Sequence, residues 1–219
     1  MLKLADALKI TEFFMPHFEP LCEPGCCKVA GSVRRGKSYV HDIEFVLKPI
    51  LKAPIPIFGI KPKDQPRTML DMKLRELVQL EYLYFQSGAE KNKKYWINME
   101  KFELEADKDF ILDLWLTTPL AQFGVNYVIR TGPASPQDHF SKWIVTPRSS
   151  GGALPDGYRV KHAAVWRVDQ LDVKDKPFEG ECPLPTPTEE SFLAFLGISE
   201  VDAAFEPSER HADWGRYTR

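Results

Sequence analysis

The segment "AGSVRRGKSYVHDIEFV", residues 30–46, has a cationic first half and two carboxylates in its second half. Asp42 and Glu44 alternate with apolar residues, which is the period-2 pattern of a β-strand. Residues two apart on a strand point to the same face, so we expect the two carboxylates side by side. Because two carboxylates at that distance repel each other, a proton or a cation is expected between them.

The first half of the segment has the groups that bind a phosphate chain. Gly31 lets a triphosphate approach the backbone closely because it has no side chain. Ser32 offers a hydroxyl and the backbone N–H groups of a turn, which favour anions. Arg35 can donate two parallel hydrogen bonds to phosphate oxygens. The segment therefore predicts a phosphate clamp followed by a metal platform.

A third acid, Asp113, lies in the most strand-like segment of the chain, "KDFILDLWLTT", residues 108–118. Alternation places Asp113 on the face of Ile111 and Trp115, away from four apolar residues, Phe110, Leu112, Leu114 and Leu116. A carboxylate there is costly unless it has a partner or a metal. If this strand neighbours the first, three carboxylates can converge, as two-ion phosphoryl transfer with Mg²⁺ requires.

Composition sets wide limits on the protein class. The chain has 219 residues, 43% of them hydrophobic, a formal net charge of −2 and a pI of about 6.2. That is enough for one sizeable core or two small ones. Nothing in the overall charge indicates nucleic-acid binding, so a basic surface must be local. Without an apolar run of about 18 residues or a signal peptide, we expect a cytoplasmic protein with no membrane partner.

The remaining pattern predicts alternating helices and strands. Helices are predicted over residues 4–21, 67–83, 118–132 and 135–145, and from Thr188, which is the expected N-cap of a last helix. Strands are predicted over residues 27–31, 42–50, 94–100 and 108–118, with a hairpin over residues 157–169. Turns or loops are predicted over residues 22–27, 51–66, 87–93 and 149–157.

Three of the four cysteines lie in "CEPGCC", residues 22–27, and the fourth is Cys182. This spacing does not match a pair of zinc knuckles, and no His or Cys cluster supplies further ligands. We therefore expect ordinary reduced thiols rather than a zinc site or a disulfide.

The segment at residues 31–46 resembles the nucleotidyltransferase signature of family X DNA polymerases, the group of DNA polymerase beta. The likeness extends in order from about residue 20 to 210, through "TMLDMKLRELVQL", "KYWINME", "FILDLWLTT", "GVNYVIRTGP" and "PLPTPTEESFLAFLGISEVDAAFEPSER". It implies an α+β fold. A nucleotidyltransferase-type palm of mixed β-sheet and helices, with an N-terminal helix, would cover residues 1–130, and a small α+β thumb residues 131–219.

The resemblance also implies roles for individual residues. Asp42 and Glu44 would bind two Mg²⁺ or Mn²⁺ ions, and Asp113 would bind the ion that activates the primer 3′-hydroxyl. The β- and γ-phosphates of a dNTP would be held by Gly31, Ser32 and Arg35. Thr131 and Gly132 would lie against the incoming sugar.

The sequence departs from the family pattern at several positions. Glu44 replaces the commoner second aspartate, and His41 stands where glycine is usual. Ile129 and Arg130 replace aromatic residues, which weakens strict deoxyribose selection, and Pro133 replaces serine. The resemblance covers a palm and a thumb and does not extend to the usual lyase and helix-hairpin-helix domains, so we expect weak binding of DNA unless an accessory DNA-binding protein assists. Local cations could contribute phosphate contacts: Lys28, Arg34, Arg35, Lys37, Lys91, Lys93, Lys94, Lys142 and Arg148.

These features favour a minimal template-directed DNA polymerase that acts on a primer-template or gapped DNA, as in gap filling or DNA repair. The alternative is a template-independent nucleotidyltransferase that acts on RNA, a protein or a small molecule. A non-catalytic binding module of the same fold is a third hypothesis, and the presence of all three carboxylates argues against it.

Overall fold

The computed structural model describes residues 1–51, 66–88, 91–104, 110–117, 121–133 and 140–198. The chain forms two compact units, each built from two stretches of sequence. Unit 1 comprises Met1–Val29 and Ser38–Leu116, and unit 2 comprises Ala30–Lys37 and Thr117–Arg219. This division differs from the predicted domain boundary at residue 130, because residues 30–37 and 117–130 belong to unit 2. No helix in the described ranges is both long and apolar enough to cross a membrane.

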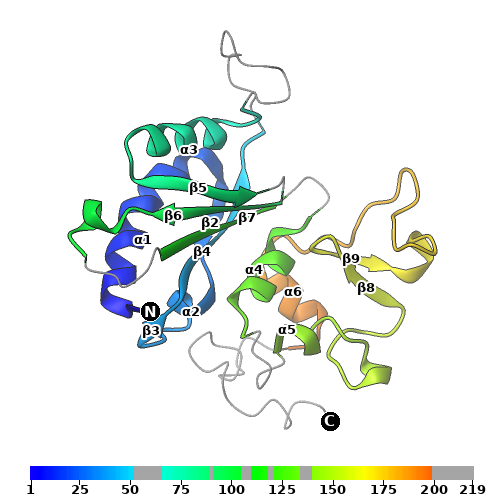
Figure 1. Ribbon diagram of the computed structural model, residues 1–219. Helices are drawn as coiled ribbons and strands as arrows, with labels where there is room; N and C mark the ends of the chain where they lie inside the picture. Colours follow the sequence, from blue (N-terminus) through cyan, green and yellow to red (C-terminus); the bar gives the residue numbers. More distant parts are fainter. Residues whose placement is uncertain (52–65, 89–90, 105–109, 118–120, 134–139, 199–219) are drawn as a thin grey trace. The chain divides into compact units, whose positions relative to one another are not determined.

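Unit 1 is built on a mixed five-stranded sheet, so the predicted α+β class is confirmed (Figure 1). The strand order is β2 (Cys22–Val29), β4 (Asp42–Pro49), β7 (Phe110–Leu116), β6 (Asn92–Ile97) and β5 (Leu83–Gly88). Strands β4 and β7 are parallel, and the other neighbours are antiparallel. A separate two-stranded ribbon pairs β1 (Leu2–Lys3) with β3 (Tyr39–Val40).

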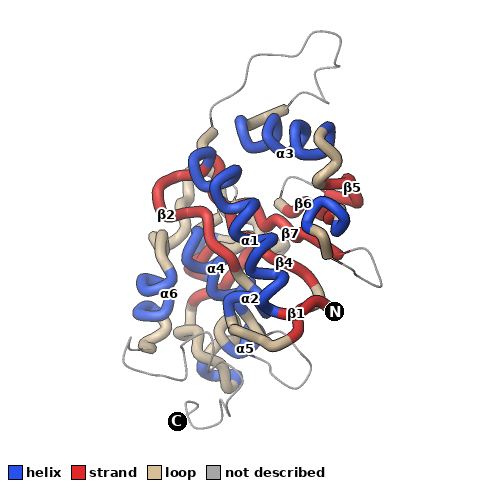
Figure 2. The backbone as a smooth tube through the Cα atoms, turned by 90° about the vertical axis from the view of Figure 1, so that its left-hand side faces the viewer, coloured by secondary structure: helices blue, strands red, loops and turns tan. Residues whose placement is uncertain are grey.

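One face of this sheet is covered by helices α1 (Leu4–Phe18) and α3 (Met69–Gln79). Phe18 of α1 contacts Phe45 of β4, with their ring centroids 5.5 Å apart. Asp71 of α3 pairs with Lys93 of β6 on the same face. Figure 2 shows the unit from the side, with α1 in front of the strands. Because side chains alternate along a strand, the carboxylates of β4 and β7 point to the opposite face.

Helix α3 begins where the sequence has a capping box. The Thr68 side chain accepts a hydrogen bond from the N–H of Asp71, and the Asp71 carboxylate accepts one from the N–H of Thr68. This reciprocal pair satisfies two backbone donors that the helix would otherwise leave unbonded. The helix ends at Gln79, so residues 80–83 lie outside it, and Leu83 instead begins strand β5.

The turn predicted over residues 22–27 is wrong. These residues begin strand β2, and the pairing shifts register between Cys22, opposite Pro49, and Cys27, opposite Leu47. Gly25 has a φ of +74°, which a residue without Cβ adopts readily, so the irregularity stays within the strand. All four cysteines are free thiols, and Cys182 is exposed. The predicted loop over residues 51–66 lies almost wholly outside the described residues.

Unit 2 combines four helices with a hairpin in its described part. They are α2 (Gly31–Arg34), α4 (Phe123–Thr131), α5 (Phe140–Trp143), α6 (Glu189–Phe195), and strands β8 (Tyr158–Lys161) and β9 (Ala164–Arg167). The predicted strand over residues 27–31 therefore ends at Val29, and Gly31 starts a helix. The predicted Thr188 cap is confirmed, because its side chain accepts from the N–H of Ser191. Residues 135–139 of another predicted helix lie outside the described ranges.

Helices α4 and α6 approach each other very closely. A Cβ added to Gly124 of α4 would come within 1.9 Å of the Thr188 carbonyl oxygen. The apolar side chains beneath them form one buried cluster with the hairpin, including Val125, Val128 and Phe192. Glycine at position 124 is therefore a packing requirement of unit 2.

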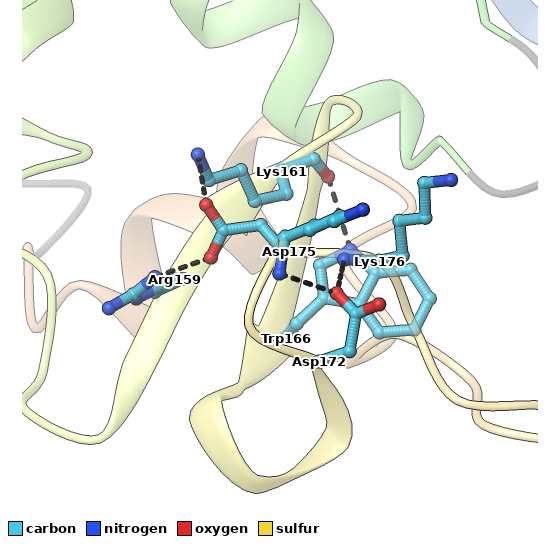
Figure 3. A network of polar contacts seen from close by, with 7 residues as sticks. Arg159, Lys161, Trp166, Asp172, Asp175 and Lys176 are labelled. Carbon is cyan, nitrogen blue, oxygen red and sulfur yellow. Dashed lines mark hydrogen bonds and ion pairs between the residues drawn. The ribbon is translucent and has the colours of Figure 1, made fainter.

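A polar network joins the hairpin to the loop that follows it (Figure 3). The Asp175 carboxylate accepts from Arg159 and from Lys161, whose Nζ is 2.8 Å away. The Asp172 side chain accepts two backbone N–H bonds within the loop, each 2.8 Å long. The buried Trp166 indole donates to the Lys161 carbonyl at 3.1 Å. These contacts give a small hairpin a defined loop conformation.

Candidate active site

The three predicted metal-binding carboxylates lie in unit 1, on the sheet face opposite α1 and α3. In the parallel pairing of β4 with β7, Glu44 is directly opposite Asp113, and Asp42 is opposite Ile111. The two strands are thus neighbours, as the convergence of the acids required. Asp42 and Glu44 are half-buried, whereas Asp113 is only 3% exposed.

Asp113 has two partners from strand β6. Its Oδ1 accepts a hydrogen bond from Asn92 Nδ2, and its Oδ2 lies 2.9 Å from Lys94 Nζ. Lys94 is the residue directly opposite Asp113 in the antiparallel pairing of β6 with β7. The sequence predicted that a buried acid here needs a partner or a metal, and the structure provides a lysine and an amide.

Glu44 is positioned by a neutral donor. Trp115 Nε1 donates to Glu44 Oε1 at 3.3 Å. Trp115 is two residues from Asp113 on β7, so the alternation that places Asp113 on this face also places the indole there. The sheet face that was predicted to carry the acids thus also carries Trp115, whose indole orients Glu44.

The donor set suits hard divalent ions, because all three groups are carboxylates on one sheet face. Glu44 and Asp113, however, contact protein donors. In the part of the chain that the structure describes, no group of three His, Cys, Asp or Glu side chains is close enough to hold a metal ion. The residues fit Mg²⁺ or Mn²⁺ in chemistry, and ion binding would require the carboxylates to turn toward one another.

The predicted phosphate-binding and sugar-binding residues lie in unit 2, where α2 and the end of α4 come together. Arg35 donates to the carbonyl oxygen of Thr131, so α2 contacts the end of α4. Gly31 and Gly132 have φ angles of +59° and +68°, which favour glycine at both positions. Ser32 Oγ is buried and has no hydrogen-bond partner among the described residues.

Arg34, which was predicted only as a DNA contact, anchors the predicted phosphate-binding residues within unit 2. Its guanidinium binds both carboxylate oxygens of Glu189, at 3.0 and 2.5 Å, and donates to Thr131 Oγ1 at 2.8 Å. It also lies over the Tyr127 ring, 4.0 Å from the centroid. A bidentate pair of this kind fixes orientation as well as position. Arg34 therefore joins α2 to α4 and α6.

Other predicted DNA-contacting cations also have protein partners. Lys93 pairs with Asp71 on the helix-covered face of the sheet, and Lys94 pairs with Asp113 on the other face. Arg148 donates to the carbonyl oxygens of Ala153 and Leu196. Alternation along β6 could have predicted that Lys93 and Lys94 point to opposite faces of the sheet. Which acid each lysine binds depends on strand pairing.

Comparison with models of known protein families and with curated proteins finds no match to this chain.

Proposed function

We propose that the chain is a nucleotidyltransferase of the DNA polymerase beta type, which transfers a nucleotide from a dNTP or NTP to a primer 3′-hydroxyl and releases pyrophosphate. The observation that carries the proposal is the parallel register of β4 and β7, in which Glu44 lies opposite Asp113. Strand alternation adds Asp42 to the same face. This is the carboxylate placement that the resemblance to family X DNA polymerases implies.

The three carboxylates have distinct proposed roles. Asp42 and Glu44 would provide oxygen ligands for both ions, and Asp113 would be a ligand of one ion and would help to take the proton of the primer hydroxyl. Two bound Mg²⁺ or Mn²⁺ ions supply charge stabilisation for the attacking and leaving oxygens. Trp115 keeps Glu44 oriented through its indole N–H.

The proposed triphosphate site consists of Gly31, Ser32 and Arg35. The Ser32 hydroxyl supports it, because it is buried without a hydrogen-bond partner among the described residues, and a ligand oxygen would satisfy it once α2 exposes it. Thr131 and Gly132, the proposed sugar contacts, end helix α4 beside Arg35. Arg34 acts on this site indirectly, since it holds α2 against α4 and α6.

The test is nucleotide addition to a one-nucleotide-gapped DNA, with Mg²⁺ or Mn²⁺ and each dNTP and NTP supplied separately. We expect addition of the complementary nucleotide alone, and its loss in Asp42→Ala and Asp113→Ala. Asp169→Ala is the matched control, because Asp169 is an exposed acid paired with Arg167 in unit 2. This control should retain full activity.

Other outcomes would change the proposed activity. Addition without regard to the template would favour a template-independent nucleotidyltransferase. If no nucleotide is added to DNA but one is transferred to RNA ends, a protein or a small molecule, then that molecule is the acceptor. If no acceptor is modified by the wild-type protein, the nucleotidyltransferase proposal fails and the chain is better described as a binding module.

A further inference from the structure

The buried Asp113 carboxylate is paired with a cationic side chain of the protein, Lys94. Lys94 Nζ lies 2.9 Å from Asp113 Oδ2, and the Asp113 side chain is only 4% exposed. A divalent ion bound by Asp113 would use the same carboxylate. A lysine ammonium and a metal ion are both positive, so they repel each other when both contact the same carboxylate.

Neutral donors also contact the acids of this face. Glu44 is oriented by the neutral indole of Trp115, and Asn92 provides a neutral amide to Asp113. Neither donor carries a charge that opposes a metal ion. The Lys94 ammonium does, and its flexible four-carbon stem lets it move away. Its side chain is 36% exposed, so a path to solvent exists.

We infer that Lys94 is a positioning residue that competes with the metal ion for Asp113, so that ion binding displaces it from the carboxylate. The inference rests on the proposed function, since it assumes that Asp113 is an ion ligand. From β6, Lys94 thereby holds the Asp113 carboxylate of β7 in the ion-free protein and weakens the affinity of the site for divalent ions. It would set the ion concentration at which the site fills.

The test is Mn²⁺ binding to the nucleotide-free protein, measured by titration with detection of free Mn²⁺ by electron paramagnetic resonance. Lys94→Gln keeps a hydrogen-bond donor but removes the charge, and we expect it to bind Mn²⁺ about tenfold more tightly than wild type. Lys94→Arg keeps the charge and should not gain affinity. Lys93→Met is the matched control, because Lys93 lies on the opposite face and pairs with Asp71.

A gain in Lys94→Gln alone supports the inference, whether or not the wild type binds Mn²⁺ measurably. Unchanged or weaker binding in Lys94→Gln, or an equal gain in Lys93→Met, overturns it. Thermal unfolding of each variant, measured with and without Mn²⁺, checks that the compared proteins are folded. Failure of the proposed function is recognised separately, by lack of nucleotide transfer by the wild-type protein to any acceptor.

Discussion

Glu44 and Asp113 lie directly opposite each other on the parallel strands β4 and β7. About seventy residues separate them in the chain, so the sheet, rather than local sequence, brings the two acids together. Each acid accepts a hydrogen bond from a side chain of the sheet, Trp115 for Glu44 and Asn92 for Asp113. The pair is the centre of the proposed site and the first target for substitution.

Replacing Glu44 with glutamine tests the charge of this pair. Glu44→Gln keeps the length of the side chain and an oxygen that can accept from Trp115, but it removes the negative charge. We expect nucleotide transfer to fall by about 100-fold or more, because electrostatic groups at a reacting centre contribute on that scale. Single-turnover nucleotide addition measures the loss. Activity within a fewfold of wild type would remove Glu44 from the ion ligands.

Replacing Arg34 with lysine tests the anchor of unit 2. Lysine keeps the charge but cannot form the two parallel bonds to Glu189 or occupy the same position over Tyr127. We expect the free energy of unfolding to fall by about 2 kcal/mol, because hydrogen bonds to charged groups contribute about that much. Urea unfolding followed by tryptophan fluorescence measures the change.

The matched control is Arg167→Lys, which alters a fully exposed bidentate pair with Asp169. Solvent screens such pairs, so its urea midpoint should equal that of wild type. If Arg34→Lys and Arg167→Lys shift the urea midpoint equally, the Arg34 contacts stabilise the protein no more than an exposed ion pair does.

Replacing Gly124 with alanine tests the close approach of α4 to α6. The added methyl group would overlap the Thr188 carbonyl, so the helices must separate. We expect a loss of about 1–3 kcal/mol in the free energy of unfolding. Gly151→Ala is the comparison, because position 151 has a φ of +82° but open space around it, so only backbone strain is added. A smaller loss at position 124 than at position 151 would contradict the packing argument.

Asp71 gives unit 1 a dependence on acid pH. Burial by itself would raise the pKa of the Asp71 carboxyl, but hydrogen bonds from Lys93 and from the N–H groups of Arg67 and Thr68 outweigh it and lower the pKa. A lowered pKa in the folded state gives stability that is present above the ordinary aspartate value of about 3.9 and is lost as the pH falls through the lowered value.

We therefore expect the urea midpoint of the wild type to fall more steeply below about pH 3.9 than that of Asp71→Asn. Lys93→Met should flatten the same limb, because it removes the ammonium that holds the carboxylate. Parallel acid limbs in all three proteins would show that Asp71 does not control this transition.

Much of the local structure could be predicted from the sequence because it depends on neighbouring residues. The alternation around Asp113 correctly predicted strand β7 and placed the acid on the face opposite the buried Leu112 and Leu114. Thr188 with Ser191 marked the start of α6, and Gly132, with its positive φ, marked the end of α4. The predicted roles of the site residues in ion and nucleotide binding stay predictions, with the carboxylates in unit 1 and the phosphate-binding residues in unit 2.

By itself, the sequence predicted several of the strands and helices and which face of each strand carries the acids, because periodicity and capping act over a few residues. It did not predict helix α2 or strand β5. The tertiary structure alone decided that Lys94 binds Asp113 while its neighbour Lys93 binds Asp71. It also decided that Arg34 anchors Glu189 and that "CEPGCC" begins a strand. These outcomes depend on which strands and helices pair across long separations in the chain, and strand pairing is set by the packing of the whole unit.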